Sequence, residues 1–122
     1  MQTLVFVYNA NDGFVQGIID LLHKNISPRT YPCSLCAITY TNAGMRPLWK
    51  EFISGLPVEV KFLHKNEWQH MFPKNNDALP AAFWITPEGP RLCITAEEMQ
   101  AQNSLEGLMM LTMLTVKSKM QN

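Results

Sequence analysis

Two cysteines separated by two residues, Cys33 and Cys36, are the strongest candidates for chemistry in this 122-residue chain. The C-x-x-C spacing brings two sulfur atoms within bonding distance when the backbone turns between them. Such a pair can form a redox-active or regulatory disulfide, or it can supply two thiolates to zinc or copper. Free cysteine is also among the most buried residue types, so a plain core role is a third alternative.

A metal site needs ligands beyond two thiolates, because structural zinc sites use four. The predicted metal set is Cys33, Cys36 and His23, which is expected late in the first helix. His64 is expected about five strand residues from Cys36, or roughly 16 Å at about 3.3 Å per residue. That separation argues against one site built from both histidines and both cysteines. A metal shared between two chains stays open.

We expect both thiols to react slowly. A thiol becomes a good nucleophile near neutral pH only beside a helix N-terminus, a cation or a metal. The apolar run 36–40 predicts that Cys36 opens a strand, and nearby prolines make the approach of Arg29 to Cys33 uncertain. If the pair functions, the sequence favours slow oxidation to an intramolecular disulfide or the binding of a thiophilic metal.

The pattern of apolar residues predicts one α/β domain over residues 1–122 with a five-stranded sheet. The first run, 4–8, is continuously apolar and is expected at the centre of the sheet, whereas 58–63 alternates and is expected at an edge. The predicted strand order is 58–63, 36–40, 4–8, 81–85, 91–94. Helical spacing predicts helices at 14–26, 47–54, 67–71 and 105–118.

A second candidate site lies where the predicted parallel strands end. The carboxyl ends of parallel strands meet at one edge, where ligands of open α/β sheets bind. The candidate ligand-edge residues are Asn9, Asn11, Asp12, Thr41, Asn42, His64 and Pro80. Turn chemistry alone is an alternative explanation, because Asn, Asp and Thr are residue types that turns require.

The order β-α-β-α-β-α, then a proline, a β-hairpin and a closing helix, resembles the thioredoxin-like fold, a three-layer α/β/α sandwich with a mixed sheet. The resemblance implies that Pro80 follows a cis peptide bond and faces the active site. Thioredoxin-like enzymes place a cysteine between a central strand and the next helix. The matching turns here, 9–13 and 41–44, contain no cysteine, so the dithiol mechanism does not transfer by position.

The stretch Tyr31–Thr39 is also similar to a small group of uncharacterised bacterial proteins. These proteins carry a Cys-x-Leu-Cys-Ala motif between a βα opening and a second strand, and the chain has the same motif from Cys33 to Ala37. This likeness implies no activity.

Composition narrows the class of protein. Ten basic and ten acidic side chains cancel without a basic patch, so binding of nucleic acid is not expected. Three cysteines, an odd number, argue against a secreted disulfide framework. The first residues predict no signal peptide, and the run 105–116 is too interrupted by polar residues to span a membrane. The sequence therefore predicts a soluble cytoplasmic protein.

The last predicted helix is apolar on too many sides for the surface helix of a monomer. The residues expected to face the sheet are Leu105, Leu108, Met109, Leu111 and Leu114. This leaves Met110, Met113 and Val116 for contact with a second copy, which predicts a weak homodimer.

Two hypotheses for function follow from these observations. The first is a thioredoxin-like protein that uses Cys33 and Cys36 in thiol redox chemistry or in binding zinc or copper. The second is a non-catalytic binding or interaction module, with an unknown protein or small-molecule partner, that keeps the fold without a redox turn.

Overall fold

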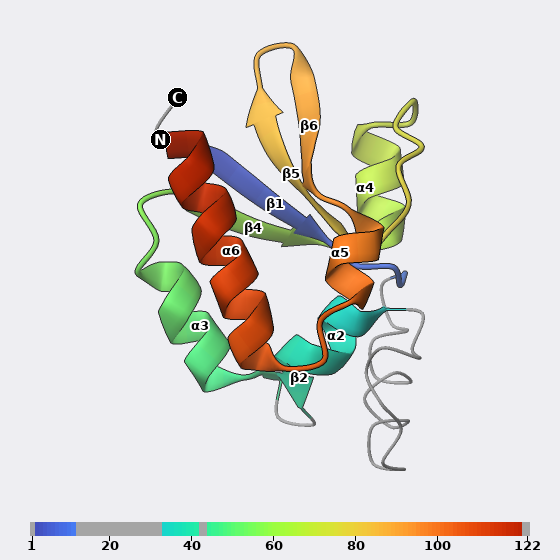
Figure 1. Cartoon of the computed structure of the whole chain (residues 1–122). Helices are drawn as coiled ribbons and strands as arrows, with labels where there is room; N and C mark the ends of the chain where they lie inside the picture. Colours follow the sequence, from blue (N-terminus) through green and yellow to red (C-terminus); the bar gives the residue numbers. More distant parts are fainter. Residues whose placement is uncertain (1, 12–32, 42–43, 121–122) are drawn as a thin grey trace.

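The computed structural model describes residues 2–11, 33–41 and 44–120. For Thr41 it describes the backbone alone. The main sheet has four strands in the order β4-β1-β5-β6 (Figure 1). Their bounds are β1 Thr3–Val7, β4 Glu59–Leu63, β5 Ala81–Thr86 and β6 Gly89–Ile94. β1 pairs parallel with β4 and antiparallel with β5, which pairs antiparallel with β6. The described part of the chain is therefore a mixed α/β structure.

The positions predicted for the first strand and the alternating strand are confirmed. β1 lies between β4 and β5, and its residues are buried apart from the partly exposed Thr3. β4 forms an edge of the sheet, with exposed Glu59 and Lys61 alternating with partly buried residues. A strand buried on both faces appears in the sequence as a continuous apolar run, whereas a strand with one exposed face shows alternating apolar and polar residues.

The predicted strand 36–40 is wrong. Ser34–Thr39 form helix α2, and only Tyr40–Thr41 form a short strand, β2. β2 pairs with β3 (Gly44–Met45) in a separate two-stranded sheet. The main sheet of the described residues thus has four strands rather than five, and the remaining strands keep their predicted order.

Helices cover both faces of the main sheet, as the layers in Figure 1 show. Helix α4 (Lys65–Met71) lies on one face. The other face carries α2, α5 (Ala96–Gln100), α3 (Pro47–Ser54) and α6 (Leu105–Met120). The predicted helix 14–26 lies outside the described residues. None of the helices that the structure describes is both long and apolar enough to cross a membrane.

Alternate residues of β1 supply two separate cores, because successive side chains of a strand point to opposite faces. The large cluster contains Leu4, Phe6 and Tyr8 together with Cys33 and Cys36. The small cluster lies on the opposite face. Its buried members are Val5, Val7, Trp68, Ala81 and Phe83.

Local sequence signals explain where several helices begin. Pro47 is the first residue of α3, where its missing N–H costs nothing. The run Thr95-Ala96-Glu97-Glu98 has the sequence pattern of a capping box, and α5 forms one: the Glu98 N–H donates to Thr95 Oγ1 at 3.0 Å, and the Thr95 N–H donates to Glu98 Oε1 at 3.0 Å. Ser104 lies immediately before α6, and its Oγ accepts the N–H of Gly107 in the first turn of the helix at 3.1 Å.

The predicted orientation of α6 is only partly correct. Leu105 and Leu108 are buried as expected, but Leu114 is 58% exposed. Val116, expected to be left over for a partner, is 3% exposed and belongs to the large cluster. The apolar residues of α6 surround the helix, so the sequence alone does not define which side faces the sheet.

Candidate functional site

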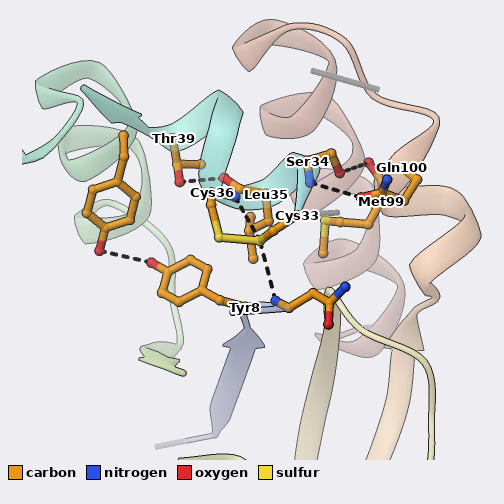
Figure 2. The surroundings of a disulfide bond; sticks show 10 residues. Tyr8, Cys33, Ser34, Leu35, Cys36, Thr39, Met99 and Gln100 are labelled. Atoms are coloured by element: carbon orange, nitrogen blue, oxygen red, sulfur yellow. Dashed lines mark hydrogen bonds between the residues drawn. A yellow bond between two sulfur atoms is a disulfide. The ribbon is translucent and has the colours of Figure 1, made fainter. Parts of the chain in front are cut away.

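Cys33 and Cys36 form a disulfide across the first turn of α2, with their Cα atoms 5.4 Å apart (Figure 2). Cys33 is the N-cap residue of the helix, and the Cys36 N–H donates to Cys33 Sγ at 3.2 Å. The sequence-based expectation that Cys36 opens a strand, without a helix N-terminus nearby, is therefore wrong.

The disulfide lies beside the carboxyl end of β1. The backbone N–H of Asn9, two residues beyond the strand, donates to Cys33 Sγ at 3.4 Å. Figure 2 shows the bridge between α2 and the end of this strand. The sequence places the pair at the opposite edge of the sheet, and this placement is wrong because it assumes a strand after Cys33.

Helix α5 holds the N-terminus of α2 in place. The Ser34 hydroxyl donates to the Met99 carbonyl at 2.9 Å, and the Ser34 N–H donates to Gln100 Oε1 at 2.9 Å. Inside α2, the Thr39 hydroxyl donates to the Leu35 carbonyl at 2.7 Å. All six residues of α2 are buried. These bonds satisfy polar groups that burial would otherwise leave unpaired at a cost of about 1–3 kcal/mol each.

Both cysteines are 0% exposed. Thiol–disulfide exchange requires an incoming thiolate to reach one sulfur atom. A bridge that solvent does not reach can react only after a local opening of the structure around it. The burial of the disulfide therefore limits the rate at which it can exchange.

The end of the sheet near the disulfide also carries Pro80 and His64. The predicted cis peptide bond between Leu79 and Pro80 is confirmed. Pro80 is buried and precedes β5, whose first residue is the register partner of the last residue of β1. His64 follows β4, and its ring centroid lies 5.5 Å from that of Tyr8, the residue before Asn9. The carboxyl end of β1 thus brings together Asn9, His64 and Pro80.

His64 has a clear structural role at the start of α4. Its Nδ1 atom lies 2.7 Å from Glu67 Oε1, and its backbone N–H donates to the same oxygen at 2.8 Å. The backbone N–H of His64, followed by its ring, holds the pKa of the Glu67 carboxyl below its ordinary value. His64 therefore belongs to a helix cap.

The remaining predicted site residues are not brought to the disulfide by anything that the structure describes. Asn11 is exposed, and the backbone of Thr41 pairs with Gly44 outside the main sheet. His23, Asp12 and Asn42 lie outside the described residues. In the ranges 2–11, 33–41 and 44–120 no three His, Cys, Asp or Glu residues are grouped to hold a metal ion. The zinc or copper set with His23 stays a prediction.

A pair of tyrosines beside the site escaped the sequence analysis. The Tyr8 hydroxyl donates to the Tyr40 hydroxyl at 3.1 Å (Figure 2). Burial raises the pKa of the Tyr8 phenol, and its hydrogen bond to Tyr40 raises this pKa further, so Tyr8 stays neutral. Tyr8 and Tyr40 are the last residues of the apolar runs 4–8 and 36–40, and no sequence signal indicates that they meet.

The third cysteine, Cys93 on β6, is partly buried, and its thiol donates to the Ala82 carbonyl at 3.4 Å. Burial raises the pKa of the Cys93 thiol from 9.0 to about 11. At pH 8 the thiolate fraction is then about 100-fold lower than for an unperturbed thiol, because each pKa unit changes it about tenfold. We expect alkylation of the oxidised protein, where Cys93 is the free thiol, to be slower by about this factor.

This slow alkylation is measured by mass spectrometry across pH 7 to 11, with a short peptide thiol as the reference. The rate at Cys93 is expected to rise throughout the range, whereas a rate that levels off above about pH 10, as for a thiol with a pKa of 9.0, would contradict the raised pKa. The unfolded chain releases this proton near pH 9 and the folded chain near pH 11. Stability from Cys93 is therefore complete below pH 9 and is lost as the pH rises towards 11.

The described residues thus define a mixed α/β protein with a C-x-x-C disulfide at the carboxyl end of its central strand. Comparisons with known proteins found no matching family model, no matching curated protein and no matching solved structure. Function is therefore inferred from the disulfide and its surroundings.

Proposed function

We propose that this chain is a thioredoxin-like thiol–disulfide protein whose Cys33–Cys36 pair changes between a disulfide and a dithiol. The observation that carries the proposal is the place of the bridge, at a helix N-cap beside the carboxyl end of β1. The mixed strand order β4-β1-β5-β6 and the position of Pro80, next to the residue that pairs with the last residue of β1, support the thioredoxin-like assignment.

The exchange proceeds in two steps. A thiolate attacks one sulfur atom of the bridge and forms a mixed disulfide while the other cysteine leaves as a thiolate. A second thiol then attacks the mixed disulfide, forms a disulfide with the first thiol and leaves the protein cysteine reduced. In total, two thiols become one disulfide, and the Cys33–Cys36 pair gains two electrons and two protons.

Cys33 is the expected nucleophile of the reduced pair. Its sulfur atom already accepts the N–H groups of Asn9 and Cys36, and hydrogen bonds of this kind stabilise a thiolate. Burial opposes the charge, so these two N–H groups must offset part of the cost of desolvation. The proposal is therefore a slow, redox-responsive pair, with little activity as a general disulfide reductase.

The proposal is tested by a redox titration of the Cys93→Ser variant, which leaves only the pair to be counted. The folded protein is equilibrated in thiol–disulfide buffers. Its free thiols are then alkylated and counted by mass spectrometry of the intact protein. We expect a reversible two-electron transition between about −180 and −300 mV, the range in which disulfides exchange with cellular thiols. Circular dichroism should show that both states are folded.

The second candidate is a non-catalytic module with a structural disulfide, and the complete burial of both sulfur atoms favours it. In that case the folded variant stays oxidised at potentials below about −300 mV and is reduced only in denaturant. This result would contradict the redox proposal. The bridge would then contribute about 2 kcal/mol to stability, the entropy of closing a very short loop.

A further inference from the structure

Five residues form an exposed stripe along α6, called here the α6 stripe: Glu106, Met110, Met113, Lys117 and Met120. They are separated by four, three, four and three residues, the spacing of the seam of a coiled coil. Met110 is 60% exposed and Met113 is 42% exposed. Large apolar side chains thus occupy the middle of the stripe, where a monomer would be expected to carry polar ones.

The α6 stripe points away from the core of the protein. The buried residues of the helix lie on another face: Leu105, Leu108, Thr112 and Val116. In Figure 1, α6 runs along the outside of the molecule next to α3. Between these two helices is a shallow groove of about 400 Å³, whose lining includes Leu48, Phe52 and Met113.

The two charges of the stripe determine which partner fits it. A two-fold axis between positions 111 and 112 places Met110 of one copy opposite Met113 of a second copy when the two α6 helices run antiparallel. The same register places Glu106 opposite Lys117 at both ends of the contact. A parallel pair would instead place Glu106 against Glu106 and Lys117 against Lys117. The sequence of the stripe is therefore complementary to itself only in the antiparallel arrangement.

We infer that the α6 stripe is a self-association surface, on which the antiparallel α6 helix of a second copy of this chain packs. Flexible methionine side chains suit such a contact, because they adapt to a shallow groove. The contact is one helix pair, well below the standard interface of about 1,600 Å², so we expect a dissociation constant on the order of 100 µM. This inference is independent of the redox proposal.

Charge reversal tests both the surface and its orientation. Glu106→Lys and Lys117→Glu each turn two attractive contacts of the dimer into repulsive ones, so each should weaken association about tenfold at low salt. The double variant exchanges the two charges and should associate like the wild type. Sedimentation equilibrium from about 10 µM to about 1 mM covers the expected dissociation constant.

Matched controls separate the α6 stripe from general changes in charge or hydrophobicity. Met110→Lys should abolish association, whereas Met71→Lys, at an exposed methionine on α4, should leave it unchanged. Glu88→Lys in the β5–β6 turn controls for net charge. Non-reducing electrophoresis excludes links through Cys93. A wild-type protein that is monomeric at about 1 mM, or a double variant as weak as either single variant, would overturn the inference.

Discussion

Replacing Phe6 with alanine is expected to lower the free energy of unfolding by about 4 kcal/mol. Phe6 is 0% exposed in the central strand β1. Its ring contacts Trp49 edge-to-face at 5.6 Å and stacks on Phe62 at 5.4 Å between centroids. The substitution leaves a cavity between the sheet and α3, and rigid neighbours on both sides limit its collapse.

The loss at Phe6 is measured by urea unfolding, followed by circular dichroism and tryptophan fluorescence. Leu92→Ala on β6 is the control, because Leu92 is 39% exposed and should cost less than 1 kcal/mol. Total stability is typically 5–15 kcal/mol, so the Phe6 variant should remain folded but with a lower midpoint. A loss below about 1.5 kcal/mol would show that the large cluster is not tightly packed around Phe6.

The importance of Phe6 follows from the sequence, because the run 4–8 has no polar face. A strand of this kind must be buried on both sides, and this places it inside the sheet. The alternating run around Lys61 indicates an edge by the same reasoning. The main sheet was predictable to this extent because each strand carries its own burial pattern. The capping box of Thr95 and Glu98 was predictable for a similar reason, since all its atoms are local.

Helix α2 was not predictable by these means. Residues 36–40 contain Ile38, Thr39 and Tyr40, which favour strands, and all six residues of α2 are buried, so no amphipathic period is visible. Its N-terminal Ser34 instead bonds to Met99 and Gln100, 65 and 66 residues further along the chain. Tertiary contacts of this kind override local propensity.

The candidate site was predictable in its chemistry but not in its position. The C-x-x-C spacing indicated that Cys33 and Cys36 could form a disulfide. However, the contact between Asn9 and Cys33 depends on how α2 packs against β1. Because the apolar run 36–40 predicts a strand, the sequence places the cysteines at the wrong end of the sheet. It also predicts slow thiols for lack of a helix N-terminus. Burial now gives a different physical reason to expect slow exchange.

Replacing Trp68 with alanine is expected to cost about 4 kcal/mol as well, but on the opposite face of the sheet. Trp68 is the buried residue of α4. The centroid of its ring lies 4.3 Å from that of Phe83 and 4.8 Å from that of Phe72. Its indole N–H donates to Asn75 Oδ1 at 3.2 Å. The loss is measured by the same urea unfolding. A cost below about 1.5 kcal/mol would contradict tight packing of the small cluster.

The two substitutions together decide how the disulfide is reached. Phe6 belongs to the large cluster, which contains Cys33 and Cys36, whereas Trp68 belongs to the small cluster, which contains no cysteine.

If reduction requires only a local opening near α2, Phe6→Ala should accelerate reduction by dithiothreitol, while Trp68→Ala should change the rate less than about threefold. If the bridge is reached only through global unfolding, both variants should accelerate reduction by about 1,000-fold, the factor that corresponds to 4 kcal/mol. Selective acceleration by Phe6→Ala is the result we expect of a redox-responsive pair, and equal acceleration would identify the bridge as structural.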